Sequence, residues 1–219
     1  YLTLSDDEKN ASSLIPETYI FDYTSTGDIT DDLPSKYNLG NVDGKNFISE
    51  VKDQGNLGIC WSFASYGQIE SKLLISSNKS YDSSSQLFSE RQIDYATSNN
   101  GIKNYDNKMG FRALGSGGNF TISSYAMASG LTMVDDSLMG YSSSLEQLEY
   151  SKVLNDKNSL YEVNSAIKVP VLNIVDLDLT NSDDIKKRDS YLSLIKNNVI
   201  KNGGAYVGTE SPQSSCSIL

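Results

Sequence analysis

The sequence predicts an α+β protein, with helices over most of its first two thirds and β-structure nearer its C-terminus. Three observations support this prediction. Apolar residues after Cys60 recur at the spacing of one helix face. Ser89 and Gln92 have the three-residue spacing of a capping box, which predicts a second helix starting near Ser89. Residues 169–179, Val-Pro-Val-Leu-Asn-Ile-Val-Asp-Leu-Asp-Leu, are β-rich and alternate between apolar and polar from Val175 onward.

Residues 1–32 are polar and acidic, with few apolar side chains. We expect this segment to be an extended arm or the tail of a propeptide, packed across something larger. A frayed terminus is the alternative. The chain begins at Tyr1 without a recognisable signal peptide, which suggests a processed or trimmed product.

A loop punctuated by glycines, Gly55 to Gly58, leads directly into Cys60. Beyond it, Ile69 and Leu73 lie four residues apart with polar residues between them, so a helix is predicted. Cys60 is therefore expected at or near a helix N-terminus, where unpaired N–H groups and the macrodipole lower the thiol pKa. Gln54 offers an amide donor close to the sulfur. A thiolate beside a neutral donor suits acyl transfer.

Further elements are predicted along the chain. A third helix is expected over residues 122–129, closed by a glycine, and residues 142–162 are expected to be partly helical. Residues 182–202 form a helical pattern that ends in Asn-Gly-Gly, and a strand is predicted over residues 205–208. Asp176 and Asp178 suggest a metal site, but alternation places both on the solvent face, so solvated carboxylates are the preferred reading.

Bulk composition limits the classes of partner. The formal net charge is −10 over 219 residues, and no basic stripe exists to neutralise phosphates, so nucleic acid is not an expected partner. No apolar run approaches the roughly 20 residues of a membrane span.

The two cysteines, Cys60 and Cys216, do not form a disulfide framework, and no cofactor is predicted. The abundance of Asn, Ser, Lys, Asp and Ile is typical of proteins from AT-rich genomes, and a bacterial source is expected.

Residues 54–64 read Gln-Gly-Asn-Leu-Gly-Ile-Cys-Trp-Ser-Phe-Ala. This run resembles the papain-like cysteine proteases, whose hallmark is Gln-Gly-x-Cys-Gly-Ser-Cys-Trp followed by an aromatic-Ala pair. Leu57 replaces the first cysteine, normally a disulfide partner, and Ile59 replaces the Ser or Ala before the nucleophile. The change at Leu57 removes a disulfide bond of the family but none of the groups that take part in the reaction. A buried structural cysteine is the alternative role for Cys60.

Four other segments resemble the family more weakly and occur in the same order along the chain as in the family. They are residues 33–39, 87–92, 117–118 and 205–208. The resemblance implies a two-domain papain-like fold, in which a helical left domain faces a β-barrel-like right domain across a cleft. It divides this chain into an arm or propeptide remnant (1–32), a mainly helical left domain (33–165) and the beginning of a right domain (166–219). A secreted or cell-surface location is expected with it.

The resemblance also implies the chemistry, which is peptide-bond hydrolysis by a thiolate. Cys60 is the expected nucleophile, with its backbone N–H and the Gln54 amide binding the oxyanion. Gly117 and Gly118 are expected to pair with an extended peptide, and a flexible glycine turn is the alternative. Phe120 is expected to form a pocket wall, and Trp61 to contribute to the substrate site beside the nucleophile.

The sequence contains no histidine. In the family the catalytic histidine follows the cysteine by about 130–150 residues, which is roughly residues 190–210 here. Three explanations remain open: a second polypeptide carrying the His and Asn, a sequence that covers part of the enzyme, or an inactive module that binds peptides or acts as a scaffold. The bulk of Ile59 mildly favours the inactive module, while Gln54, Cys60 and Trp61 oppose it.

Overall fold

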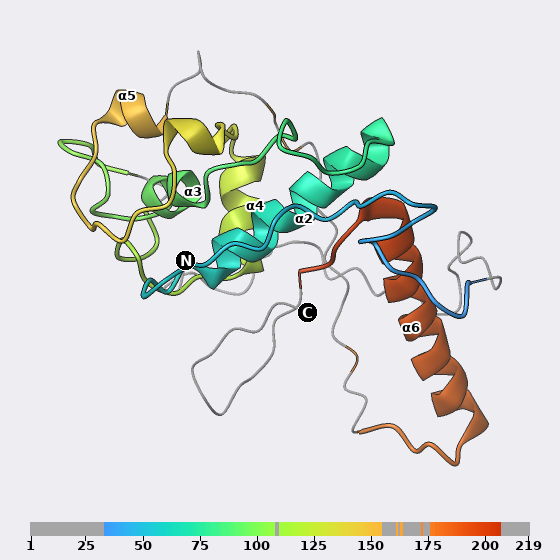
Figure 1. Cartoon of the computed structure of the whole chain (residues 1–219). Helices are drawn as coiled ribbons and strands as arrows, with labels where there is room; N and C mark the ends of the chain where they lie inside the picture. Colours follow the sequence, from blue (N-terminus) through green and yellow to red (C-terminus); the bar gives the residue numbers. More distant parts are fainter. Residues whose placement is uncertain are drawn as a thin grey trace. The chain divides into compact units, whose positions relative to one another are not determined.

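The computed structural model of the chain describes residues 33–107, 110–154, 161, 163, 172 and 176–206 (Figure 1). They belong to two compact units. The larger comprises the described residues from 33 to 163 together with 195–206, and the smaller comprises residues 172 and 176–194. The N-terminal arm predicted at residues 1–32, most of the strand predicted at 169–179 and Cys216 lie outside the described residues.

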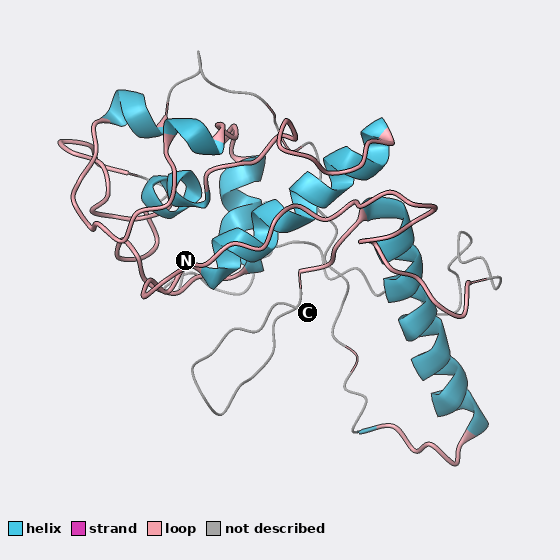
Figure 2. Ribbon diagram, in the orientation of Figure 1, coloured by secondary structure: helices cyan, strands magenta, loops and turns pink. Residues whose placement is uncertain are grey.

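The larger unit is helical, and its helices are joined by long loops (Figure 2). Helix α2 is in contact with both α3 and α4. Around them lies one apolar core that includes Trp61, Tyr66, Phe88, Ile93 and Met133, each at most 2% exposed. The helices of this unit are α2 (Cys60–Ser77), α3 (Glu90–Ala96), α4 (Phe120–Ala128), the 3₁₀ helix η1 (Asp136–Leu138) and α5 (Tyr150–Val153).

Helix α2 begins at Cys60, which confirms the predicted helix start. It ends at Ser77 and is capped by Asn78, which adopts the left-handed conformation with φ of 53°. The Asn78 N–H donates to the carbonyl of Ile75, 3.0 Å away, and so satisfies one of the last carbonyls of the helix.

Helix α3 starts as the capping spacing predicts, and the Ser89 side chain accepts a hydrogen bond from the Gln92 N–H. Only half of the capping box forms. The Gln92 amide instead donates to the carbonyls of Thr132 and Val153, at 2.7 and 3.2 Å. Because Gln92 is buried, its side chain joins α3 to two later segments instead of reaching back to Ser89.

Helix α4 was predicted over residues 122–129 and is observed at Phe120–Ala128. The earlier start follows from Asn119, whose side chain accepts from the Ile122 N–H at 3.1 Å. Gly130 has φ of 93° just beyond the helix, in agreement with its predicted role as a stop.

β-structure in the described residues is limited to isolated bridges, such as Phe88 with Asp135 and Ser98 with Arg112. Among the described residues 142–154, α5 is the single helical segment and has four residues, about one turn, so the partly helical prediction holds only there. Residues 205–206 are irregular, and the remainder of that predicted strand lies outside the described residues. The β-barrel-like right domain therefore remains a prediction.

Helix α6 (Ser182–Asn202) has the bounds that the sequence predicts, and Gly203 follows it with φ of 86°. The strand prediction is wrong for the described residues 176–179, which contain a bend and the start of a turn. The Asp178 carboxylate accepts from the N–H and hydroxyl of Thr180, at 2.9 and 2.7 Å. Such local side-chain bonds compete with an extended ladder, so the aspartate makes a turn into α6.

Candidate active site

Cys60 is the first residue of an 18-residue helix, and its side chain is half-buried. Ile59 precedes it at the cap position and makes no side-chain capping bond. The first turn contains no acidic residue, so the positive end of the helix dipole is not neutralised there by a carboxylate of that turn. The N-terminal end of a helix favours a negative charge nearby, so the position of Cys60 suits an anionic sulfur.

The two residues near Cys60 that differ from the expected motif, Leu57 and Ile59, belong to a small apolar cluster. Leu57, Ile59 and Phe63 pack together and are 8%, 0% and 7% exposed. The bulk of Ile59 therefore points into the protein and not into solvent beside the sulfur. Leu57, which stands where a cysteine was expected, fixes the loop to the first turn of α2 by apolar contact.

Gln54 lies on the loop that leads to Cys60 and is half-buried. Its amide nitrogen donates to the Leu57 carbonyl at 3.0 Å, which uses one of the two hydrogens on that nitrogen. The Gln54 main-chain carbonyl accepts a hydrogen bond from the Tyr141 hydroxyl. Sequence reasoning did not identify Tyr141, which comes from a distant part of the chain.

The glycine segment predicted to bind substrate lies directly against residues 54–59, here called the nucleophile loop because they lead to Cys60, the expected nucleophile. The Gly58 N–H donates to the Gly115 carbonyl at 2.9 Å. A β-carbon at Gly58 would lie 3.2 Å from the Gly117 nitrogen, so only glycine gives this close approach without a shift. Two stretches that are more than 50 residues apart in sequence, Gly55–Gly58 and Gly115–Gly118, are thereby brought together.

Gly118 covers the indole of Trp61. A β-carbon at Gly118 would meet three indole atoms at 2.5–2.7 Å. Trp61 is 1% exposed, so its expected contribution to the substrate site comes through the glycine backbone that it supports. The Arg112 guanidinium lies 4.6 Å from the ring centroid on a cation–π contact, which holds the indole in place.

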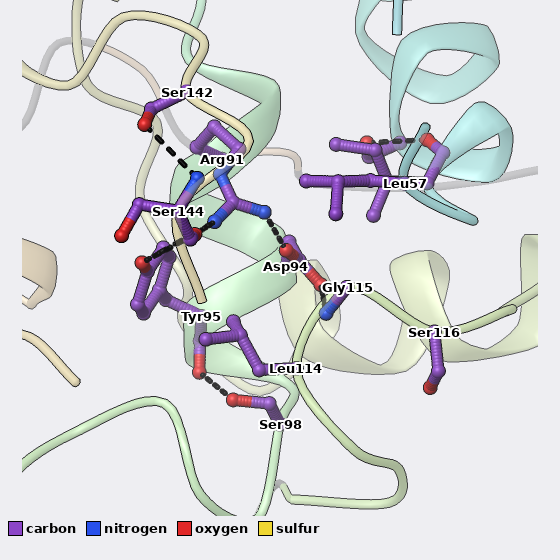
Figure 3. Close-up of polar contacts among 12 residues, drawn as sticks. Leu57, Arg91, Asp94, Tyr95, Ser98, Leu114, Gly115, Ser116, Ser142 and Ser144 are labelled. Carbon is purple, nitrogen blue, oxygen red and sulfur yellow. Dashed lines mark hydrogen bonds and ion pairs between the residues drawn. The ribbon is translucent and has the colours of Figure 1, made fainter. Parts of the chain in front are cut away.

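Buried charges hold the same glycine segment in place, a feature that the sequence did not reveal, and Figure 3 shows the part of this network that joins Arg91, Asp94 and Gly115. Asp94 forms ion pairs with Arg91 and Arg112, and all three side chains are at most 6% exposed. The Asp94 carboxylate also accepts from the Gly115 N–H at 3.1 Å. Arg112 donates to the Ser116 carbonyl at 2.9 Å. Each buried charge is thus paired, as burial in a protein interior requires.

Phe120 occupies the first position of α4 and is half-buried. Its ring packs against Tyr206 with the centroids 5.8 Å apart and the planes at 58°. Gly117 is exposed, and a β-carbon there would meet nothing within 4 Å. An open glycine backbone therefore runs into a pair of aromatic rings.

A second buried cluster of charges anchors the segment before the nucleophile loop. The Lys52 ammonium lies 2.7 Å from Glu90 and 3.3 Å from Glu70. Glu70 also accepts from the Ser49 hydroxyl at 2.6 Å and the Phe88 N–H at 2.9 Å. The cluster ties the chain before Gln54 to both α2 and α3.

The protonation of this cluster follows from one ammonium facing two carboxylates. Burial raises the pKa of Glu90 to about 7, although the attraction of Lys52 opposes the shift. Burial alone would lower the pKa of Lys52, but Glu90 and Glu70 together raise it above its usual value.

Within the part of the chain that the structure describes, no group of three or more His, Cys, Asp or Glu residues is placed to hold a metal ion. The helices among the described residues are all too short or too polar to cross a lipid bilayer.

Comparison with known proteins gave two findings. A family model described as "Papain family cysteine protease" matches residues 33–163, which is more than half of the chain. Among solved structures, the chain is similar to the digestive procathepsin L 3 of the Tenebrio molitor larval midgut, at 22% sequence identity and a TM-score of 0.37. That match covers 53% of this chain and 32% of the procathepsin chain, so the similarity spans about a third of the insect protein.

Proposed function

The chain belongs to the papain family of cysteine proteases, and on this premise we propose that it hydrolyses peptide bonds with Cys60 as the nucleophile. Family membership implies a papain-like fold and protein or peptide substrates. The observation that carries the proposal is that α2 begins at Cys60 without a capping side chain or an acidic first turn. An ionised sulfur is stabilised at that position.

In the proposed reaction, the Cys60 thiolate attacks the carbonyl carbon of the scissile peptide and a carbon–sulfur bond forms. The carbonyl oxygen becomes an oxyanion, which accepts from the Cys60 backbone N–H and from the Gln54 amide. The carbon–nitrogen bond then breaks, and the leaving amine takes a proton from a histidinium. Water, activated by the same histidine, hydrolyses the thioester and returns the thiol.

The main chain of Gly117 and Gly118 supports the proposed path of the substrate. Within the described residues, neither glycine uses its N–H or carbonyl in a backbone hydrogen bond outside the helices. An extended peptide can therefore add to this segment as a strand adds to a sheet edge. The half-buried Phe120 beside Tyr206 favours an apolar side chain of the substrate at that point.

The general base must come from outside these 219 residues, because they contain no histidine. A second polypeptide that carries the histidine and an asparagine is one source, and a further stretch of the same protein is the other. Denaturing intact-mass measurement of the native material separates these sources. Detection of neither would leave Cys60 without a base and would count against the peptidase.

The experiment that tests the proposal is alkylation of Cys60 by iodoacetamide between pH 5 and 8 in the native protein. An activated thiolate is alkylated rapidly at pH 5–6, whereas an ordinary thiol with a pKa near 8.5 is not. Mass spectrometry locates the label, and free cysteine in the same solution is the reference. Cys60→Ser is expected to abolish both hydrolysis of an unfolded protein substrate and the labelling at residue 60. A Cys60 that follows the pH dependence of free cysteine would refute the proposal.

The second candidate function is a catalytically inactive module that binds peptides, and the absence of histidine favours it. The buried position of Ile59 removes one argument for it, since that side chain does not obstruct the face beside the sulfur. Peptide binding that persists with an unreactive Cys60 would favour this candidate over the peptidase.

A further inference from the structure

Residues Met139–Leu145, here called the strap, cross the loop that precedes Cys60. Each end of the strap is anchored to α3 or its cap. The Ser89 hydroxyl donates to the Met139 carbonyl, and the Arg91 guanidinium donates to the Ser144 carbonyl at 2.6 Å. Both donor side chains are buried, with exposures of 0% and 2%. The backbone between the two anchors is thus held on each side.

Tyr141 lies between these anchors and contacts both sides of the nucleophile. Its hydroxyl donates to the main-chain carbonyl of Gln54, six residues before Cys60. Its ring packs on Phe63, three residues after Cys60, with the centroids 6.1 Å apart and the planes at 57°. One side chain therefore links the loop that bears the Gln54 amide to the first turn of α2.

The backbone at Gly55 is shaped to admit this hydroxyl. Gly55 has φ of 56°, and a β-carbon there would lie 2.6 Å from the Tyr141 oxygen. Any side chain at residue 55 would therefore displace the hydroxyl from the Gln54 carbonyl. The hydrogen bond from Tyr141 to Gln54 therefore requires glycine at residue 55.

The far end of the strap touches both loops of the site. A β-carbon at Gly115 would lie 2.6 Å from Leu145 and 3.2 Å from Leu57. Leu145 thus fills the space above Gly115 beside the leucine that replaces the expected cysteine. The strap spans from the Gln54 side of the site to the glycine segment.

We propose that Tyr141 is a positioning residue that sets where the Gln54 amide lies relative to the N-terminus of α2. This role rests on the proposed peptidase function, since it concerns the geometry of the two oxyanion donors. The tyrosine is 37% exposed, so its burial contributes little, and its specific contacts are the hydroxyl on Gln54 and the ring on Phe63. Removing the hydroxyl frees the Gln54 peptide while leaving the ring contact.

The test is Tyr141→Phe in the native protein, together with any polypeptide that supplies the histidine. A peptide aldehyde adds to the Cys60 thiol as a hemithioacetal, whose oxygen takes the thiol proton and occupies the oxyanion site. Alkylation by iodoacetamide needs the thiolate but no oxyanion donor. We expect the variant to bind the aldehyde about fivefold more weakly, the effect of one lost hydrogen bond, with an alkylation rate within about twofold of wild type.

Two further measurements separate positioning from general destabilisation. Hydrogen exchange of peptides covering residues 53–58 should be faster in Tyr141→Phe than in wild type, while the exchange of α6 is unchanged. Tyr150→Phe is the matched control, because Tyr150 is exposed and its ring packs on Tyr105 away from the nucleophile loop. It should alter neither the aldehyde affinity nor the exchange of the loop.

Failure of the positioning role and failure of the proposed peptidase function give different results. Wild-type aldehyde affinity in Tyr141→Phe, or unchanged exchange at residues 53–58, would overturn the positioning role while leaving the peptidase intact. A parallel loss of aldehyde affinity and alkylation rate would also overturn it, since the sulfur itself would then be perturbed. A wild-type protein that does not bind the aldehyde at all would instead refute the peptidase, and the positioning role with it.

Discussion

Replacing Lys52 with methionine would leave two buried carboxylates without their shared cation. Glu70 and Glu90 are 2% and 3% exposed, and Lys52 is 16% exposed. Methionine is close to lysine in length, so the substitution removes the charge and little of the packing. Breaking a buried ion pair by removing one partner costs about 3–5 kcal/mol. We expect a loss of that size at pH 8.

The loss depends on pH in a direction set by Glu90. The carboxyl has an ordinary pKa of 4.5, and burial raises it to about 7 in the folded protein although Lys52 opposes the shift. Between these two values the folded state holds more protons than the unfolded state, so stability falls as pH rises through this window. Lys52, whose own pKa is raised, stays charged throughout it. Without Lys52 the Glu90 carboxyl is protonated more readily, which removes one of the two buried negative charges, so the loss should shrink to below about 2 kcal/mol at pH 5.

The assay is urea unfolding of wild type and Lys52→Met at pH 5 and pH 8. In a thermal unfolding experiment at pH 8, the expected loss of stability would lower the melting temperature of Lys52→Met by about 6–20 °C. Lys103→Met is the matched control, because Lys103 pairs with Glu149 at 3.2 Å on the surface, where both side chains are about half exposed or more. The control should change stability by less than about 1 kcal/mol. An equal loss at both pH values, or a loss at pH 8 no larger than the control's, would refute the reasoning.

Four other substitutions, one of them a control, test the support of the site, each by urea unfolding. Gly118→Ala should lower the free energy of unfolding by about 1–3 kcal/mol, because its β-carbon would press on Trp61. Its control, Gly117→Ala, has open space around it and should be nearly neutral. Equal effects of the two substitutions would contradict the packing. Asp94→Asn should cost about 3–5 kcal/mol by leaving two buried guanidinium groups short of a counter-charge, and a loss under about 1 kcal/mol would disprove that pairing. Ser89→Ala should cost about 1–3 kcal/mol, since it removes both a helix cap and a donor to a buried carbonyl; no loss would mean that neither bond contributes.

Local signals in the sequence predicted the helices well. The start of α2 at Cys60, the Ser89 cap of α3 and the glycine after α6 each lie where the residues next to them in the sequence indicate. Capping and left-handed turns are short-range effects, so a single sequence contains the information needed to place them. The arrival of Gly117 beside the nucleophile loop was expected only through the family resemblance.

Long-range partners could not be predicted in this way. Asp94 and Arg112 are 18 residues apart, and Tyr141 follows Gln54 by 87 residues. Nothing in the spacing of such residues encodes that they meet, because the contact depends on how the helices pack. The wrong strand prediction at residues 176–179 has another cause. Apolar and polar residues alternate there, which favours a strand, but the Asp178 side chain bonds within its own turn.

The apolar contact of Leu57 with Ile59 and Phe63 has a consequence for redox chemistry. A thiol nucleophile must be kept reduced, and the reductants that protect it also open any disulfide nearby. A loop fastened to its helix by carbon side chains is indifferent to the thiol–disulfide balance of its surroundings. If Cys60 is the nucleophile, as proposed, its oxidation would stop the reaction and its reduction would restore it without loosening the loop before it.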